Sequence, residues 1–223
     1  MEWQTDLGKA RTDAATGGKA LLLYFAAAGD CADAKADKNV RAMADADELR
    51  KLSQEQVLFV FVPAREGDAA AEPAGPAAKP APALIPKDRL AAEDLWASYG
   101  VPAGPYFVLT DSWGNEHSRH NWRLDAKSLG TGLSQMQKNM AKADARMQAQ
   151  LDKAQGCVDR GEREAAMPHL REVFAWKLVG RPAGVAAAAL FGEICVKVRE
   201  EAAALKGKED TESKERLALL RRA

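Results

Sequence analysis

The sequence contains few cysteines, few aromatic residues and no excess of either charge. Three cysteines in 223 residues are too few for a disulfide scaffold, and aromatic residues make up only 6%. The 32 Lys and Arg residues balance 32 Asp and Glu residues, which removes the usual reason to expect nucleic acid or an anionic membrane surface as a partner. No apolar run approaches the roughly 20 residues of a membrane-spanning helix. The composition therefore indicates a soluble globular protein.

The N-terminal residues also lack the basic and apolar segments of a secretory signal. This absence leaves two alternatives, a cytoplasmic protein or the mature part of a secreted one. At roughly 100–200 residues per domain, the length suits one large domain or two small ones.

The first half alternates between helical patterns and short strand-like runs. Three short apolar runs predict buried strands, and a fourth strand follows a turn at residues 111–115; the four are residues 20–25, 57–62, 106–110 and 116–121. Helices are predicted at residues 5–18, about 31–38, 45–54 and 88–99. Asp45 and Glu48 have the spacing of a capping box at the start of the third helix. This order of elements predicts an α/β fold.

Residues 64–86 differ in composition from the rest of the first half. They consist mostly of Ala, Pro and Gly, with five prolines from Pro73 to Pro86. Such a segment lacks the apolar side chains that would order it, so we expect an exposed, extended and mobile insertion.

Strand signals end at about residue 125, and the rest of the sequence is helical. The predicted helices are residues 133–160, 162–178, 185–205 and a short charged one at 210–222. We therefore expect two domains, residues 1–125 and residues 126–223.

Two motifs in the first half resemble the thioredoxin superfamily. The strand at residues 21–25 and the following Gly-Asp-Cys-Ala-Asp-Ala-Lys of residues 29–35 lie where that family has a strand and then Trp-Cys-x-x-Cys-Lys. Residues 95–108 lie where it has a helix end, Tyr-Gly-Val, and then Thr-Pro-Thr-Phe-Val. The resemblance implies a thioredoxin-like α/β sandwich, in which helices flank a central mixed sheet, followed by an all-α helical-hairpin extension. Trp3 and the helix after it resemble the lead-in of the extracytoplasmic branch, which slightly favours a periplasmic or secreted location.

The same resemblance implies a site. Cys31 occupies the position of the attacking cysteine, and Pro105 the position of a cis-proline that lies beside it. Gly104 precedes that proline and, with Asp30, is expected to face the substrate. The second cysteine of the motif is replaced by Ala34, so a mixed disulfide cannot be resolved within the motif. The resemblance therefore argues against an ordinary dithiol reductase.

The reactivity of Cys31 depends on opposing effects. A helix N-terminus stabilises a thiolate and lowers its pKa. Asp30 and Asp33 act in the opposite direction, and Lys35 partly offsets them. We expect a modestly acidic thiol, although a structural or relic cysteine is also consistent with the sequence.

Two hypotheses for the function follow. In the first, the chain is a thiol-disulfide oxidoreductase that uses Cys31 alone on the thiols or disulfides of partner proteins. In the second, it is a catalytically inactive protein- or peptide-binding module in which Cys31 is incidental. Neither hypothesis calls for a cofactor.

The helical half resembles a degenerate tetratricopeptide-type repeat around residues 151–170, with Gly161 at the turn between two helices. Only about one and a half repeats are visible. The alternatives are a protein-binding appendage and a helical cap that stabilises the first domain.

Two further groups of residues were candidates for chemistry. Cys157 and Cys195 would pair only if their helices lie side by side, and two separate thiols are favoured. His117 and His120 are three residues apart and would face opposite sides of a strand, so we expect no metal site there.

Overall fold

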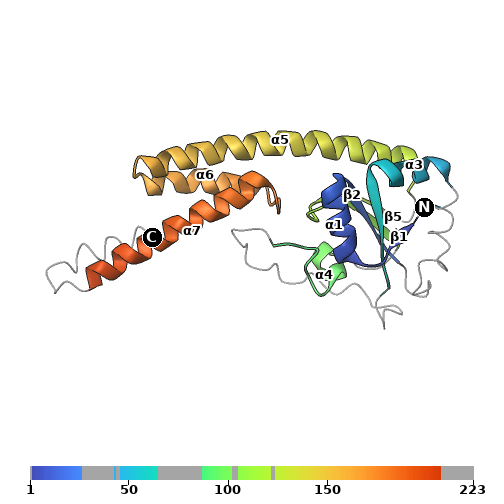
Figure 1. Ribbon diagram of the computed structural model, residues 1–223, viewed down its shortest axis with the longest axis horizontal. Coiled ribbons are helices and arrows are strands. Elements are labelled where there is room, and N and C mark those ends of the chain that lie inside the picture. Colours follow the sequence, from blue (N-terminus) through green and yellow to red (C-terminus); the bar gives the residue numbers. More distant parts are fainter. Residues whose placement is uncertain are drawn as a thin grey trace. The chain divides into compact units, whose positions relative to one another are not determined.

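The computed structural model describes residues 2–26, 43, 46–64, 87–101, 105–121 and 124–206 (Figure 1). They form two compact units, the first ending at Met140 and the second beginning at Ala141, within helix α5 (Ala126–Asp159). The predicted boundary at residue 125 coincides with the start of α5, but the compact units divide further along that helix. The two-domain division therefore stays a prediction.

The first unit is built on a five-stranded mixed sheet. The strand order is β1-β3-β2-β4-β5. Strand β3 pairs in parallel with β1 and β2, whereas β4 is antiparallel to both β2 and β5. The bounds are β1 (Trp3–Gln4), β2 (Ala20–Phe25), β3 (Val57–Val62), β4 (Tyr106–Thr110) and β5 (Glu116–Asn121). The predicted α/β class and all four predicted strands are confirmed. Strand β1 was not predicted, because two residues are too few to show a period.

The side chains of the central strand β2 alternate between two faces of the sheet. Leu23 and Phe25 belong to a core that also holds residues of helices α1 (Leu7–Gly17) and α4 (Leu95–Tyr99). On the other face Tyr24 stacks on Phe107, with ring centroids 4.7 Å apart. Helix α5 covers part of this second face. It passes close to Leu109 of β4, because a Cβ added at Gly132 of α5 would lie 3.2 Å from the Leu109 Cδ2 atom. Burial on both faces explains why β2 is a continuous apolar run.

The helices predicted at residues 45–54 and 88–99 both begin later than predicted. Helix α3 (Asp47–Glu55) has Ala46 as its N-cap and no side-chain cap bond, so the predicted capping box is wrong. Helix α4 begins at Leu95, not at residue 88, because the carboxylate of Asp94 accepts a hydrogen bond from the Ala97 amide and fixes the first turn there. The preceding residues form turns, in which the Asp88 carboxylate accepts from the Leu90 amide.

The second unit consists of the C-terminal part of α5, α6 (Arg163–Ala175) and α7 (Pro182–Lys206). Its apolar core includes Met147, Leu170, Phe174 and other residues from all three helices. Helix α5 begins seven residues before the predicted start, because the Asp125 carboxylate accepts from the Ser128 amide at 2.7 Å. No helix of the described residues is long and apolar enough to cross a membrane.

Three predicted segments lie outside the described residues. They are the helix at about 31–38, the insertion at 64–86 apart from its first residue, and the helix at 210–222.

Gly114 and Gly130 provide a matched pair of glycine-to-alanine tests. Gly114 has φ +81°, and an added Cβ would lie 2.5 Å from Leu90 Cγ and 2.9 Å from the Tyr99 hydroxyl oxygen, whereas a Cβ at Gly130 in α5 meets nothing within 4 Å. We expect Gly114→Ala to lower the free energy of unfolding by about 2 kcal/mol or more. Gly130→Ala should raise it by about 0.5–1 kcal/mol. Urea denaturation of both variants checks this, and equal effects would contradict the described packing of the turn at Gly114.

Candidate functional site

Four strands of the sheet reach the same end. Phe25, the last residue of β2, pairs with Val62 of β3 on one side and with Tyr106 of β4 on the other. Tyr106 pairs in turn with Asn121, the last residue of β5. In open sheets with parallel strands, ligands bind beyond the carboxyl ends of those strands. This end of the sheet is therefore the place to look for a site.

Pro105 lies at this end. It is half-buried and directly precedes Tyr106. On the neighbouring strand the described chain continues to Ala26, whose amide donates to the carbonyl of Val62 at 3.0 Å. Cys31 follows five residues later in the sequence. Cys31, Asp30, Ala34 and Gly104 themselves lie outside the described residues.

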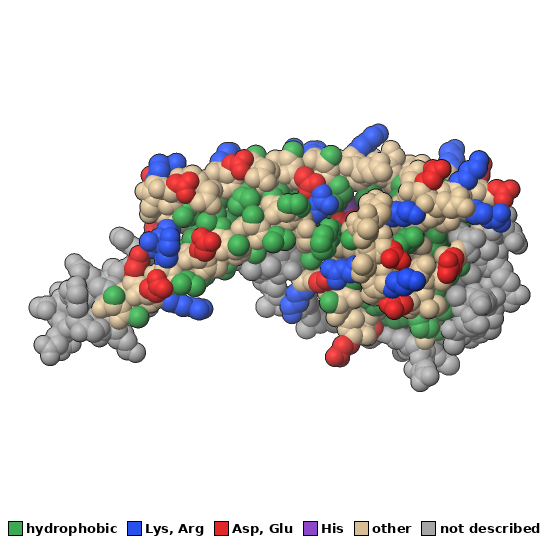
Figure 2. Space-filling view, viewed as in Figure 1, with side chains coloured by type: hydrophobic (Ala, Val, Ile, Leu, Met, Phe, Trp, Pro, Cys, Tyr) green, Lys and Arg blue, Asp and Glu red, His purple; other side chains and the backbone are tan. Residues whose placement is uncertain are grey.

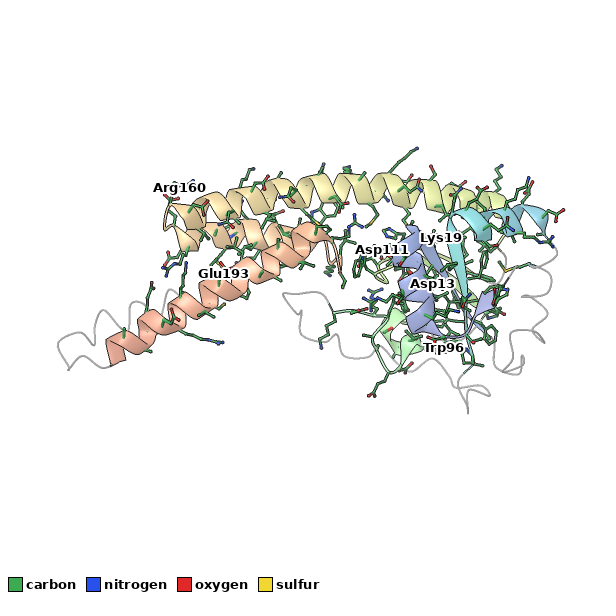
Figure 3. The ribbon with its side chains drawn as sticks, viewed as in Figure 1. Asp13, Lys19, Trp96, Asp111, Arg160 and Glu193 are labelled. Atoms are coloured by element: carbon green, nitrogen blue, oxygen red, sulfur yellow. The ribbon has the colours of Figure 1, made fainter. Side chains whose placement is uncertain are left out.

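Trp96 of α4 links two of the chain segments at this end. Its indole Nε1 donates a hydrogen bond to the carbonyl of Pro63, 3.1 Å away, just after β3 ends. Its ring packs edge-on against Phe25, with centroids 5.1 Å apart, and its own carbonyl accepts from the Val101 amide at 2.9 Å (Figure 3). The sequence indicated Trp96 only as an apolar residue on a helix. In the structure it fixes both the exit of β3 and the exit of α4.

Arg119 of β5 holds the end of α4 in a similar way. Its guanidinium donates to the carbonyls of Tyr99 and Gly100, the last residues of the helix and its cap. Glu116 accepts from Arg119 at 3.0 Å and pairs with Arg89 at 3.2 Å. A cation that bonds the last carbonyls of a helix satisfies groups that have no partner within the helix. The chain thus leaves α4 from a fixed point, five residues before Pro105.

The opposite end of the β4–β5 hairpin contains a buried carboxylate. Asp111 is 7% exposed and accepts from the amides of Trp113 and Asn115, both at 3.0 Å, and from the Asn115 side chain at 2.8 Å (Figure 3). Burial raises the pKa of Asp111, but the nearby His117 ring and the hydrogen bonds from Asn115 and Trp113 outweigh burial and hold the pKa below its ordinary value. The carboxylate is therefore charged at neutral pH and organises the turn. Because residues 111–115 were predicted only as a turn, sequence reasoning missed this role.

Tyr99 ties α4 to the same turn. Its hydroxyl donates to the carbonyl of Gly114 at 2.8 Å. The Arg89 guanidinium carbon lies over the Tyr99 ring, 5.5 Å from the ring centroid. Burial raises the pKa of Tyr99 and keeps the phenol neutral, which suits a donor.

The two histidines considered for metal binding have separate surroundings. His117 Nε2 is buried without a hydrogen-bond partner and lies 3.9 Å from Asp111 Oδ2, beyond hydrogen-bond distance. His120 Nε2 lies 3.3 Å from the Ser118 hydroxyl. In the described part of the chain, no three His, Cys, Asp or Glu side chains gather in a way that could hold a metal ion.

The two cysteines of the helical unit are free thiols. Cys157 is buried and Cys195 partly buried, in agreement with the prediction of two separate thiols. The Arg160 guanidinium lies 3.5 Å from the Cys157 sulfur.

Comparison with known proteins gives little. No protein-family model matches the chain, and no curated protein matches it. One solved structure, titled DsbH oxidoreductase, superposes with a TM-score of 0.39 and 16% sequence identity, over 60% of this chain and 85% of that one. A likeness this slight carries no argument about function, and the α/β class stands on the sheet topology above.

Asp111 generates a test of stability against pH. Because the native pKa of this carboxyl lies below its unfolded value, its contribution is complete above about pH 4 and is lost as the pH falls through the native pKa. We expect Asp111→Asn to lower the free energy of unfolding at pH 7 by about 1–3 kcal/mol, and by much less near pH 2. Asp13→Asn, on the exposed side of α1, is the control and should change neither value. Denaturant titrations at several pH values measure the difference, and an equal loss at both pH values would contradict the assignment.

Proposed function

We propose that this chain is a thioredoxin-like protein that acts on the thiols or disulfides of partner proteins through one cysteine, Cys31. The observation that supports this most is the pairing of Phe25 with Tyr106. It brings the strand that leads to Cys31 beside the strand that follows Pro105. The two motifs, far apart in the sequence, therefore adjoin neighbouring strands, which supports the resemblance.

The surroundings of this place suit a binding edge. Trp96 fixes the chain just after β3 and Arg119 fixes it at the end of α4, both through hydrogen bonds to backbone carbonyls. Pro105 has no backbone N–H, so it cannot donate a hydrogen bond to a partner at this position. A partner peptide in an extended conformation would then bind through the remaining backbone groups and a few side-chain pockets.

The chemistry needs only one thiol from this chain. The thiolate of Cys31 attacks one sulfur of a partner disulfide; a new S–S bond forms, the old one breaks, and the departing sulfur leaves as a thiolate that takes up a proton. Ala34 supplies no second thiol. The mixed disulfide therefore persists until a thiol of the partner, or a small free thiol, attacks it. An extracytoplasmic compartment, where protein disulfides persist, would provide such partners.

The reactivity of Cys31 tests the proposal directly. We expect Cys31 to alkylate rapidly near pH 7, with a pKa below the ordinary thiol value of about 8.5. A short pulse of iodoacetamide on the full chain between pH 5 and 9, followed by peptide mass spectrometry, gives the rate at each cysteine. Cys157 and Cys195 serve as internal controls and should react more slowly, since one is buried and the other partly buried. A Cys31 that reacts no faster than an ordinary thiol would overturn the proposal and favour a non-catalytic binding module.

Restoring the missing cysteine gives a second test. The wild-type chain should show little reduction of insulin by dithiothreitol above background, because the mixed disulfide has no resolving thiol. Ala34→Cys should raise the turnover at least tenfold, whereas the matched control Ala34→Ser should leave it unchanged. Robust turnover by the wild type would mean that Cys157 or Cys195 resolves Cys31. No gain in Ala34→Cys would argue against a thioredoxin-like placement of residues 31–34.

A further inference from the structure

The outer face of α7 carries the two large hydrophobic side chains that are exposed among the described residues. Val185 is 60% exposed and Val196 is 50% exposed. They are 11 residues apart, which is three turns of helix, so they point in nearly the same direction. Ala187, Leu190 and Ile194, on the opposite face of the same helix, are buried in the core of the second unit. Figure 2 shows hydrophobic side chains along the helical unit, with charged ones between them.

Two small residues lie between the valines on this face. Ala189 and Gly192 are both exposed, and a Cβ added at Gly192 would meet nothing within 4 Å. The four positions 185, 189, 192 and 196 are separated by four, three and four residues, so the series reads the same in both directions. We call these four positions the α7 stripe. Residues 182–192 carry no charge, and the first charged side chain is that of Glu193 (Figure 3).

A pocket adjoins one end of the α7 stripe. It has a volume of about 210 Å³, and its walls include Met147, Phe174, Leu178 and Val185. Most of these side chains are apolar, and Gly184 and Ala188 of α7 also line it. The pocket is larger than one aliphatic side chain. An apolar side chain of another molecule that packs against Val185 could therefore be partly enclosed by the pocket walls.

We propose that the α7 stripe binds a second copy of this chain, with the two α7 helices antiparallel. A twofold axis between residues 190 and 191 places Val185 opposite the partner's Val196, and Ala189 opposite the partner's Gly192. Each contact occurs twice, as an isologous interface requires. The partner's Val196 then comes against the wall of the pocket at Val185. A parallel pair would set Val196 against its own copy, three turns away from that pocket.

The small residues and the length of the stripe set the strength of this association. Ala189 and Gly192 allow the two backbones to approach closely, as small residues do where helices cross. The stripe is only about 17 Å long. A stable interface usually buries about 800 Å² on each partner, and three turns of helix bury less than that. We therefore expect a dimer that dissociates on dilution in the micromolar range.

Sedimentation velocity of the full chain between about 5 and 500 µM tests the proposal. The wild type should shift from monomer to dimer over this range. Val185→Glu and Val196→Lys should each weaken association at least tenfold, whereas Ala186→Glu, which lies about 100° around the helix from Val185, should not change it. Circular dichroism confirms that each variant is folded. A wild type that stays monomeric at every concentration, or an Ala186→Glu that disrupts as strongly as Val196→Lys, would overturn the proposal.

The double variant Val185→Glu/Val196→Lys decides the orientation. In the antiparallel pair each new glutamate faces a lysine of the partner subunit, so the double variant should associate more tightly than either single variant. In a parallel pair like charges would face each other, and the double variant would be the weakest of all. That second outcome would overturn the antiparallel arrangement.

Gly192→Ala separates the interface from helix stability. Alanine favours the helix and meets no neighbour in one copy, so the melting temperature of the dilute protein should rise by about 2–4 °C. The added methyl group stands between the paired helices, so dimerisation should weaken. A rise in melting temperature with unchanged association would count against close packing at the stripe.

If the chain dimerises only after residues 207–223 are deleted, those residues cover the stripe instead, and the proposal fails.

Discussion

The pairing of β2 on both of its edges is the constraint on which the first unit depends. β2 is parallel to β3 on one side and antiparallel to β4 on the other, and every residue of β2 is buried. A strand in that position needs apolar side chains on both faces, which its sequence supplies. It also fixes, through Phe25, which residues of β3 and β4 lie at the end of the sheet. Pro105 lies at this end because Tyr106, the residue after it, pairs with Phe25.

The supports of that end come from residues far apart in the sequence. Trp96 bonds the carbonyl of Pro63, and Arg119 bonds carbonyls at the end of α4. In both contacts a side chain donates to a backbone carbonyl that has no partner within a helix or sheet. Because the acceptors are backbone carbonyls, these bonds themselves require no particular side chain at the accepting positions. The constraint that the bonds place on the sequence therefore falls on the donors.

The sequence predicts the parts of this fold that have a strong local signal. The strands at residues 20–25 and 57–62 are apolar throughout, and their bounds are confirmed. The predicted start of α4 was wrong, because it depends on which aspartate caps the helix. Asp94 caps α4, whereas the Asp88 side chain accepts a hydrogen bond within the preceding turn. Of the candidate site, the sequence suggested Pro105 and Cys31 through a resemblance, but it gave no sign of Trp96 or Arg119 as anchors. Their partners lie 33 and 19–20 residues away, and no local pattern encodes such contacts.

The turn at Asp111 has a consequence for the order of folding. Its hydrogen bonds join residues two to four apart, and the Tyr99 hydroxyl reaches Gly114 across only 15 residues. Phe25 and Tyr106, by contrast, are 81 residues apart. Contacts between near residues close small loops and form first, whereas distant pairings must wait for a large loss of chain entropy. We therefore expect the β4–β5 hairpin with α4 to form early in the folding of the first unit. The pairing of β2 with β4, which completes the end of the sheet where Pro105 lies, should form later.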